Sequence, residues 1–572
     1  MAKMTGSRLF AEMMQGYGVS HIFFVPTLMQ KALAEMEDMP IRRIMVHGEK
    51  SSAYMADGYA RASGKPGVCT AQVVGGSNLA AGLRDGYMAG SPIIAITGGP
   101  TPQSRHRHAY QDLTDDFTQF GPVTKFRARV DAVNRLPDLL RQAFREATSG
   151  APAPVYLQVQ SPLGVMTEQE AEMDPCVETQ FSRAPAFRPE PEMQRVRDVA
   201  AILVKAKRPI IVAGGGVVTS RAQGEVVELA EKLQIPVVTS LNAKATIVDA
   251  HPLAAGVSGL YSRTCANVAL CEADLVFFIG SHTGGQVTHN WLFPPPGTPV
   301  MQLDICASEL GRNYPNQASL LGDAKVSLQR LIEVVEPKSP EATRAWTGRV
   351  QQLVAAWRAA HEPMLGSDAV PMRPERVCRE ISDALPPDGV LVSDTGHAGI
   401  WTGSMVELKH PNQRYFRCAG SLGWALPASM GVKCALPDKP VLCFSGDGGF
   451  YYHIAELETA ARYNINVVFL VNNNSALNQE IPLTDQAYGG KQRGRAGELW
   501  RFSSRNFAQI AEGFGCVGMR VEHPGELKAA LRKAFTMDKP VVLDVVTDTY
   551  ALAENVNPDT GVIVSDGKRV GI

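Results

Sequence analysis

A carboxylate set among glycines and an amide 27 positions later are the residues of this chain best suited to hold a charged ligand. Asp447 lies in GDGGF, and Asn474 ends VNNN. Side-chain oxygens suit a hard cation such as Mg²⁺, and Gly446, Gly448 and Gly449 let the backbone approach a phosphate at the start of a helix. A carboxylate repels a phosphate unless a cation lies between them, so the pattern predicts a Mg²⁺–diphosphate site.

Two strands and a helix must bring these residues together. The apolar runs PVLCFSG and INVVFLVNN predict strands, and residues 450–464 between them predict a helix with Ile454, Leu457 and Ala461 on one face. Parallel strands in such a unit end at the same edge of the sheet, where doubly wound sheets bind ligands. A lone GDG is most often a surface turn, but here the strands, the helix and the spacing all agree on a ligand site.

The whole chain of 572 residues predicts three α/β domains, because it is too long for a single core. Continuous apolar runs alternate with helical patterns throughout, which indicates parallel sheets covered on both faces. Two proline-containing stretches, 182–194 and 336–346, read as linkers, and a short helix is expected after the second. We expect an N-terminal domain at 1–180, a central domain at 190–340 and a C-terminal domain at 365–560.

Composition excludes several functional classes. The formal net charge of -1 gives no electrostatic case for nucleic acid or an anionic membrane as partner. No apolar run approaches the roughly 18 residues of a membrane span, and the N-terminal sequence lacks the apolar segment of a signal peptide. The ten cysteines form no CxxC pair, which favours reduced thiols. We therefore expect a cytoplasmic protein without nucleic-acid or membrane partners.

The motifs resemble those of thiamine diphosphate (ThDP) enzymes, which join GDG to NN at this spacing. VHGEKSSAYMADGYARASGKPGV resembles the block around the catalytic glutamate of these enzymes, and AGSLGWALPASMGVKCALPDKPVLCFSGDGGF resembles the first half of their cofactor domain. HAYQDLTDDFTQFGPVTK and HPLAAGVSGLYSRTCANVALCEADLVFFIGS resemble acetolactate synthases. The chain is therefore identified as a member of the ThDP enzyme superfamily, in its acetolactate synthase-like branch. The resemblance implies a homodimer at minimum and a homotetramer as the usual assembly.

The resemblance also implies which residues surround the cofactor. Mg²⁺ would take oxygens from Asp447, Asn474 and the Ala476 carbonyl. Leu422 would bend the cofactor, and Glu49 would act on its pyrimidine ring as the catalytic acid–base group. Without the resemblance, Glu49 would read as a solvated carboxylate at a helix start. The full set of cofactor-binding residues is Glu49, Asn78, Gly396, His397, Ala398, Gly420, Leu422, Gly446, Asp447, Gly448, Gly449, Asn474 and Ala476.

Several positions depart from acetolactate synthases where the substrate would lie. Thr27 and Leu28 stand where glycines are expected after the first strand. Tyr110 replaces a phenylalanine, whereas the neighbouring Gln111 is kept as a catalytic-site residue. A glycine-proline-glycine turn is reduced to Gly75 after two valines. The substrate is therefore left open by the sequence.

Gln479 and Glu480 replace apolar residues just beyond the expected metal loop. Glu480 falls where pyruvate decarboxylases, by resemblance, carry a glutamate that handles protons. A carboxylate enclosed in a pocket holds its proton and can act as an acid. The alternative is a salt bridge from Glu480 to a nearby base such as Lys491 or Arg493, and the sequence leaves both interpretations open.

The central segment resembles the FAD-binding domain of the synthases, with one loss. Its glycine turn, Gly214 to Gly216, is retained, but the stretch SHTGGQVT at 281–288 lacks both arginines of the FAD clamp. We expect FAD to bind weakly or not at all, and an adenine nucleotide remains an alternative. FAD would be structural rather than redox-active in this branch.

These features favour a ThDP- and Mg²⁺-dependent enzyme that decarboxylates a 2-oxo acid and joins the fragment to a second carbonyl. The alternative is a decarboxylase or C–C lyase that releases an aldehyde. Glu480 favours the alternative, whereas Gln111 and the central domain favour carboligation. A non-catalytic member of the fold is disfavoured because Glu49, Asp447 and Asn474 are intact. A nucleotide-dependent oxidoreductase is disfavoured because the glycine turn lacks a full GxGxxG.

Overall fold

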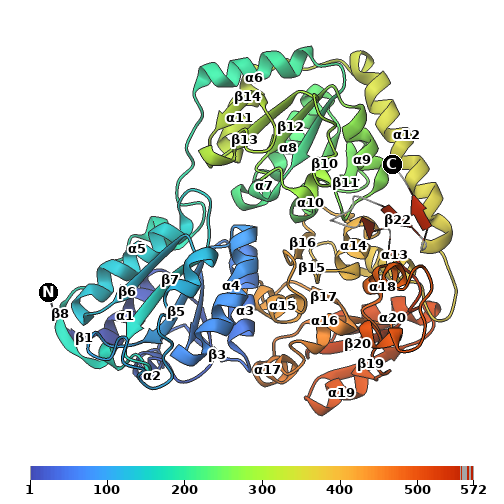
Figure 1. The fold of residues 1–572 in the computed structure, drawn as a ribbon. Coiled ribbons are helices and arrows are strands. Elements are labelled where there is room, and N and C mark those ends of the chain that lie inside the picture. Colours follow the sequence, from blue (N-terminus) through green and yellow to red (C-terminus); the bar gives the residue numbers. More distant parts are fainter. Residues whose placement is uncertain (1, 554, 557–562, 566–567, 571–572) are drawn as a thin grey trace. The chain divides into compact units, whose positions relative to one another are not determined.

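Three six-stranded sheets, each with parallel neighbouring strands, form the framework of the chain in this computed structural model (Figure 1). The structure describes residues 2–553, 555–556, 563–565 and 568–570. The sheets and the helices that alternate with them confirm the predicted α/β architecture of three domains. The boundaries drawn from the linkers stay predictions.

The chain divides into two compact units. Unit 1 comprises Met1–Phe187, Trp424–Lys439 and His453–Val467, and unit 2 comprises Arg188–Gly423, Pro440–Tyr452 and Val468–Ile572. The first sheet lies in unit 1, and the other two sheets lie in unit 2.

The sheet of unit 1 has the strand order β3-β2-β4-β5-β7-β6. Its strands are β2 His21–Phe24, β3 Arg42–Met45, β4 Gly67–Ala71, β5 Ile93–Gly99, β6 Phe126–Val130 and β7 Val155–Gln160. The central strands β4 and β5 are buried along their whole length, as expected for strands covered on both faces. A separate antiparallel pair joins β1 (Ala2–Thr5) to β8 (Glu170–Met173).

The helices of unit 1 include two from the C-terminal part of the sequence. They are α1 Gly6–Gly16, α2 Gln30–Ala34, α3 Glu49–Ser63, α4 Gly76–Ala89, α5 Leu136–Thr148, α15 Ala425–Ala435 and α17 Glu456–Tyr463, with the 3₁₀ turns η1 Val73–Gly75, η2 Thr118–Val123, η3 Val133–Arg135, η4 Val165–Glu168 and η5 Thr179–Ser182. Helices α3 and α15 touch through their backbones, because the Ala428 carbonyl occupies the space that a Cβ on Gly58 would need. Gly58 therefore permits this close packing.

The central sheet of unit 2 has the order β11-β10-β9-β12-β13-β14, which is the order 3-2-1-4-5-6 of doubly wound nucleotide-binding sheets. Its strands are β9 Pro209–Ala213, β10 Val237–Thr239, β11 Ala254–Val257, β12 Leu275–Ile279, β13 Val300–Asp304 and β14 Asn316–Leu321. Its helices are α6 Met193–Lys205, α7 Gly215–Ser220, α8 Gln223–Leu233, α9 Thr264–Glu272, α10 Gly285–Thr288 and α11 Ala324–Val334, with the turns η6 Leu241–Thr246 and η7 Ala307–Glu309.

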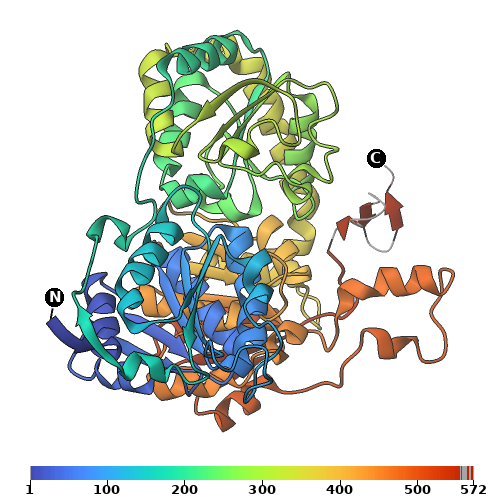
Figure 2. The same ribbon diagram turned by 60° about the vertical axis from the view of Figure 1, so that its left-hand side comes forward.

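The C-terminal sheet of unit 2 has the order β16-β15-β17-β18-β20-β19. Its strands are β15 Val390–Ser393, β16 Arg414–Arg417, β17 Val441–Gly446, β18 Val468–Asn473, β19 Val517–Val521 and β20 Val541–Val546. The accompanying helices are α13 Pro374–Ala384, α14 His397–Ser404, α16 Asp447–Tyr451, α18 Ile481–Ala487, α19 Phe507–Gly513 and α20 Pro524–Phe535, with the turns η8 Asn478–Glu480 and η9 Ala496–Leu499. Residues 481–499 (orange) extend away from this sheet in Figure 2. The last strands, β21 Asn555–Val556, β22 Ile563–Ser565 and β23 Lys568–Val570, form a small antiparallel sheet.

The second predicted linker is largely helical, which corrects the prediction. Helix α12 runs from Pro340 to Leu365, so it begins inside the stretch 336–346 and is long rather than short. Proline is compatible with the first position of a helix, because the amide it lacks has no partner there. Trp346, Val350 and Trp357 are buried along its inner face. The first linker agrees better, since residues 183–192 contain no helix or strand.

The predicted helix at 450–464 is also interrupted. Helix α16 ends at Tyr451, and α17 begins only at Glu456. The buried apolar residues of α17 are Leu457 and Ala460, with Glu456 and Thr459 also buried, whereas Ala461 is half-buried. The predicted inner face was therefore one residue out at its C-terminal end. Within the described ranges, no helix has the length and apolar character needed to cross a membrane.

Candidate active site

Asp447 and Asn474 meet at the carboxyl ends of two neighbouring strands, as the sequence predicts. Asp447 follows β17, and Asn474 follows β18, which pairs in parallel with β17. The backbone N–H of Ala476 donates to Asp447 Oδ2 at 3.2 Å and to Asn474 Oδ1 at 3.1 Å. The two side-chain oxygens therefore converge on a single amide.

Burial makes this carboxylate a strong site for a cation. Asp447 is 2% exposed, and burial raises its pKa to about 7, although the amides of Gly448, Ser475 and Ala476 oppose that rise. No lysine, arginine or histidine in the described part of the chain forms an ion pair with Asp447. A divalent cation would supply the missing positive charge and restore the ionised form.

Beside Asp447 there is open space next to the backbone, and one buried side-chain oxygen there has no hydrogen-bond partner among the described residues, as a cation or phosphate site requires. A Cβ built on Gly446 would meet no atom within 4 Å. Across the sheet, Gly446 is in register with Asn472, whose buried Oδ1 has no hydrogen-bond partner. Within the described residues, no cluster of three histidine, cysteine or acidic side chains could hold a metal. The donor set is thus one carboxylate with amide and carbonyl oxygens, which suits a hard cation.

The loop before α14 lies beside this site. Gly396 has φ 63°, a left-handed conformation that glycine adopts readily. His397 Nδ1 lies 2.7 Å from Asn478 Oδ1, and burial lowers the pKa of His397 to about 4, so its ring is neutral at pH 7. A Cβ on Gly396 would lie 2.8 Å from Gln479 Oε1. The loop before α14 therefore contacts η8 through a hydrogen bond to Asn478. The sequence did not predict this contact, because Asn478 belongs to no recognised motif.

The GSLG turn is tied to the same region through Asp394. Its Oδ1 accepts from the Gly423 amide at 3.1 Å, and its carboxyl group would lie 3.4 Å from a Cβ on Gly449. Leu422 is half-buried, and a Cβ on Gly420 would meet nothing within 4 Å. The turn therefore presents Gly420 and Leu422 next to open space.

Glu49 opens helix α3 in unit 1, where a carboxylate is favoured by the helix dipole. Asn78 in α4 donates from Nδ2 to Glu49 Oε2 at 3.2 Å. A Cβ on Gly75 would lie 2.5 Å from Glu49 Oε1 and 2.6 Å from its Cγ. Gly75, the glycine retained from the reduced turn, therefore leaves room for the Glu49 side chain in this position.

The predicted substrate residues of unit 1 differ in exposure. Tyr110 is 72% exposed, and its hydroxyl accepts from Gln111 Nε2 at 3.1 Å. Gln72 in turn donates to Gln111 Oε1 at 2.7 Å, so the Gln111 amide is held on both sides. Thr27 is exposed, whereas Leu28 is 1% exposed and packs in the hydrophobic core. Thr27 is thus the better candidate of that pair for contact with a substrate.

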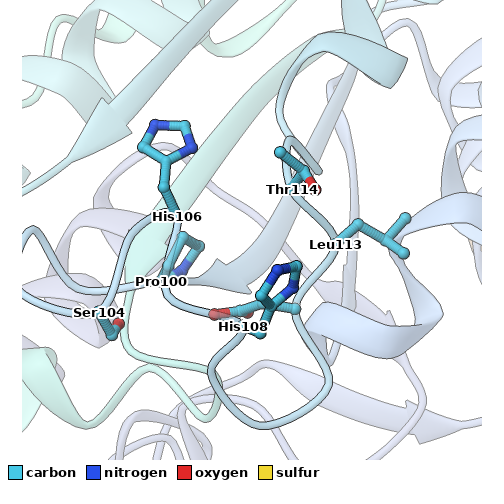
Figure 3. A pocket seen from close by; sticks show the side chains of 7 residues that line it. Pro100, Ser104, His106, His108, Leu113 and Thr114 are labelled. Carbon is cyan, nitrogen blue, oxygen red and sulfur yellow. The ribbon is translucent and has the colours of Figure 1, made fainter.

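The loop that carries Tyr110 and Gln111 encloses a small hollow (Figure 3). Its volume is about 40 Å³, which has room for water but not for a cofactor. Both carboxylate oxygens of Asp112 are buried there without hydrogen-bond partners, and burial together with nearby Asp116 raises the pKa of Asp112. The residues that line the hollow are Pro100, Ser104, His106, His108, Asp112, Leu113 and Thr114.

Glu480 does not form the salt bridge that the sequence left open. It ends η8 and is half-buried, and its backbone carbonyl accepts from the Thr484 hydroxyl at 2.8 Å. Neither Lys491 nor Arg493, both of which the structure describes, forms an ion pair with it. Within the described residues, the Glu480 carboxylate therefore lacks the ion-pair partner that the salt-bridge interpretation requires.

The glycine turn of the central domain is occupied by internal contacts. The amides of Gly214 and Gly216 donate to the carbonyls of Ile279 and Gly280 at 2.8 Å and 2.9 Å. A Cβ on Gly216 would lie 2.8 Å from the Gly280 Cα, so close packing of two loops accounts for this glycine. Two of the amides that a dinucleotide-binding turn offers to phosphate are thus already used.

Family models match parts of all three sheets. Residues 4–119 match the N-terminal TPP binding domain of thiamine pyrophosphate enzymes, residues 196–331 match their central domain, and residues 394–545 match their C-terminal TPP binding domain. Thiamine pyrophosphate is another name for ThDP. The chain therefore belongs to the thiamine pyrophosphate enzyme family.

Similar proteins narrow the assignment within that family. A probable acetolactate synthase large subunit of Methanocaldococcus jannaschii is 30% identical over 562 residues, covering 95% of this chain and 92% of the relative. A probable acetolactate synthase large subunit of Methanococcus aeolicus is 30% identical, covering 90% and 87%. Acetolactate synthase isozyme 1 large subunit of Escherichia coli is 29% identical, covering 96% and 94%. The chain lies in the acetolactate synthase-like branch, as its motifs predict.

Proposed function

We propose that the protein uses ThDP and Mg²⁺ to decarboxylate a 2-oxo acid and to join the remaining fragment to a second carbonyl compound. The observation that carries this proposal is the convergence of Asp447 and Asn474 on one amide, in a chain that resembles acetolactate synthases over nearly its full length. A homodimer at minimum, with a homotetramer as the usual assembly, is part of the proposal.

The residues of the metal loop would bind and orient the cofactor. Asp447, Asn474 and the carbonyl of Ala476 would hold Mg²⁺ against the diphosphate, and the open backbone at Gly446 leaves room for it. When bound, ThDP supplies a carbon nucleophile that attacks the 2-oxo group and accepts the electrons released with CO₂.

Proton movement falls to Glu49. Its carboxyl group would hold a proton at the pyrimidine nitrogen of the cofactor, and Asn78 fixes one of its oxygens. The carbonyl of Gly420 would accept a hydrogen bond from the amino group of that ring. A general acid–base group in this position accounts for roughly 10²–10⁴ in rate.

A second candidate function is aldehyde release without ligation. It is favoured by Glu480, whose carboxylate has no ion-pair partner among the described lysines and arginines. A free carboxyl group near the substrate can deliver a proton to the carbon that loses CO₂, and this step competes with addition to a second carbonyl.

The proposal is tested by removing and restoring the cofactors. Protein dialysed against a chelator should release CO₂ from a panel of 2-oxo acids only after ThDP and Mg²⁺ are both added. Activity that returns with ThDP alone, in metal-free buffer, would contradict the role of Asp447 and Asn474. Failure of every 2-oxo acid in the panel would contradict the substrate class.

A further inference from the structure

Helix α14 is held at its C-terminal end by two buried cations from the central domain. Lys244 in η6 donates from Nζ to the Gly403 carbonyl at 3.0 Å. Arg263, just before α9, donates from Nε to the Ser404 carbonyl at 2.7 Å. Both carbonyls lie in the last turn of α14, where the helix leaves its carbonyl groups without internal partners.

The two cations are fixed by their own surroundings. Lys244 and Arg263 are 3% and 2% exposed. Asp249 lies 2.8 Å from Arg263 Nη1 and 3.7 Å from Lys244 Nζ, and its Oδ2 accepts from the Leu408 amide. The Arg263 guanidinium also stacks over Trp357 at 4.7 Å. Removing either cation would leave buried carbonyls without a donor.

The positive charges of Lys244 and Arg263 complement the C-terminal end of α14 as well as the Asp249 carboxylate. Two cations face one carboxylate, which leaves an excess positive charge next to the C-terminal end of α14. The carbonyl groups at that end carry partial negative charge, so the excess is favourable there. A salt bridge that served only to pair charges would not need the second cation.

The opposite end of α14 is the loop expected to contact the diphosphate. The helix begins at His397, directly after Gly396, and the His397 side chain is hydrogen-bonded to Asn478 in η8. With only eight residues, α14 is too short to be stable by itself. Its position therefore depends on what holds each end.

We propose that Lys244 and Arg263 are positioning residues for the cofactor, because capping the C-terminal carbonyls of α14 holds Gly396, His397 and Ala398 in the conformation that binds the diphosphate. This inference rests on the proposed function. It gives the central domain a role in ThDP binding that requires no nucleotide in that domain.

Titration of Lys244 offers a direct readout. Burial lowers the pKa of Lys244 to about 8, with Arg263 acting in the same direction and Asp249 and Glu407 opposing it. Cys378 also faces Lys244, and burial keeps the pKa of that thiol well above its usual range, so it stays neutral. Arg358 donates to the Asp249 backbone carbonyl at 2.8 Å. Above pH 8 the amine loses its charge and caps α14 less well.

The test compares Lys244→Met and Lys244→Arg by calorimetry with ThDP in saturating Mg²⁺. We expect Lys244→Met to weaken ThDP binding about tenfold, which matches the loss of one charged hydrogen bond. Lys244→Arg should keep most of the wild-type affinity. The wild-type Kd should rise between pH 7.5 and about 9, and the Kd of Lys244→Arg should not, because a guanidinium stays charged.

Arg188→Met is the matched control. Arg188 is also a cation of unit 2 that pairs with a buried carboxylate, that of Asp323, and its hydrogen bonds go to Asp323 and Ser220. Its loss should lower thermal stability and leave the ThDP Kd unchanged. Lys244→Met with wild-type affinity, or a wild-type Kd that is flat across this pH range, would overturn the proposal.

Hydrogen exchange separates this inference from the proposed function. In protein without ThDP, the amides of residues 396–404 should exchange faster in Lys244→Met than in wild type, while the amides of β17 and β18 keep their protection. Wild-type protein that binds no ThDP would contradict the proposed function, and the exchange result would then decide the capping role. Unchanged hydrogen exchange at residues 396–404 in Lys244→Met would overturn the capping role of Lys244. If Lys244→Met does not fold, the wild-type pH profile and Lys244→Arg give the same decision.

Discussion

The Asn78 side chain donates to the Glu49 carboxylate at 3.2 Å, which joins the start of α3 to the first turn of α4. Glu49 also packs against Gly75, where a Cβ would lie 2.5 Å from Glu49 Oε1 and would displace the side chain. One carboxylate oxygen is thus held by an amide, and the side chain is confined by a glycine. This arrangement fixes the position of the Glu49 carboxylate.

Replacing Glu49 with glutamine should keep ThDP binding and remove most turnover. Glutamine preserves the shape next to Gly75 but cannot transfer a proton, so kcat should fall by roughly 10²–10⁴. The measurement is steady-state CO₂ release together with the exchange rate of the C2 proton of bound ThDP. Wild-type exchange at C2 would show that Glu49 has another role.

Replacing Asp447 with alanine should abolish the binding of Mg²⁺ and ThDP together. The change removes a charged ligand, and even residues that only support a ligand contribute about 10–100-fold to metal affinity. Calorimetry with ThDP in the presence of Mg²⁺ should therefore show no binding in the range accessible to wild type. Asp38→Ala, which removes an exposed carboxylate of unit 1, is the control and should bind normally.

Replacing Glu480 with valine should shift products from aldehyde toward the ligated compound. The variant removes a carboxyl group that can protonate the carbon left by CO₂, and loss of such a donor slows that step by roughly 10²–10⁴. The readout is the ratio of aldehyde to ligated product from one 2-oxo acid, at equal extents of decarboxylation. An unchanged ratio would show that Glu480 does not control this branch point.

Protein purified without added cofactor should carry little or no flavin. The stretch 281–288 lacks the arginines of the FAD clamp, and the amides of Gly214 and Gly216 donate to neighbouring carbonyls. Absorbance near the flavin maximum, calibrated against protein concentration, measures the occupancy. A stoichiometric amount of flavin would mean that the central domain binds FAD through other residues.

The sequence predicts the buried part of the fold best. Strands such as β17 and β18 are continuous apolar runs, because both of their faces are covered, and they were predicted from that feature. Edge strands β3, β6 and β19 were not predicted. They are partly exposed and carry arginines, so they resemble loops when only composition is considered.

The candidate site follows the same division. The meeting of Asp447 and Asn474 could be predicted, since parallel strands end at one edge of a sheet. Contacts that depend on packing between loops could not be predicted. They include the hydrogen bond between His397 and Asn478 and the packing of Gly75 against Glu49. The break between α16 and α17 was missed because the residues between these helices keep a helical apolar pattern.

The most direct test of the account is the product balance of the enzyme loaded with ThDP and Mg²⁺. A single 2-oxo acid, with pyruvate first in the panel, is supplied, and CO₂, free aldehyde and ligated product are measured in the same reaction. We predict equal amounts of CO₂ and ligated product, with aldehyde as a minor product. CO₂ matched by free aldehyde, with no ligated product, would contradict carboligation as the function of this protein.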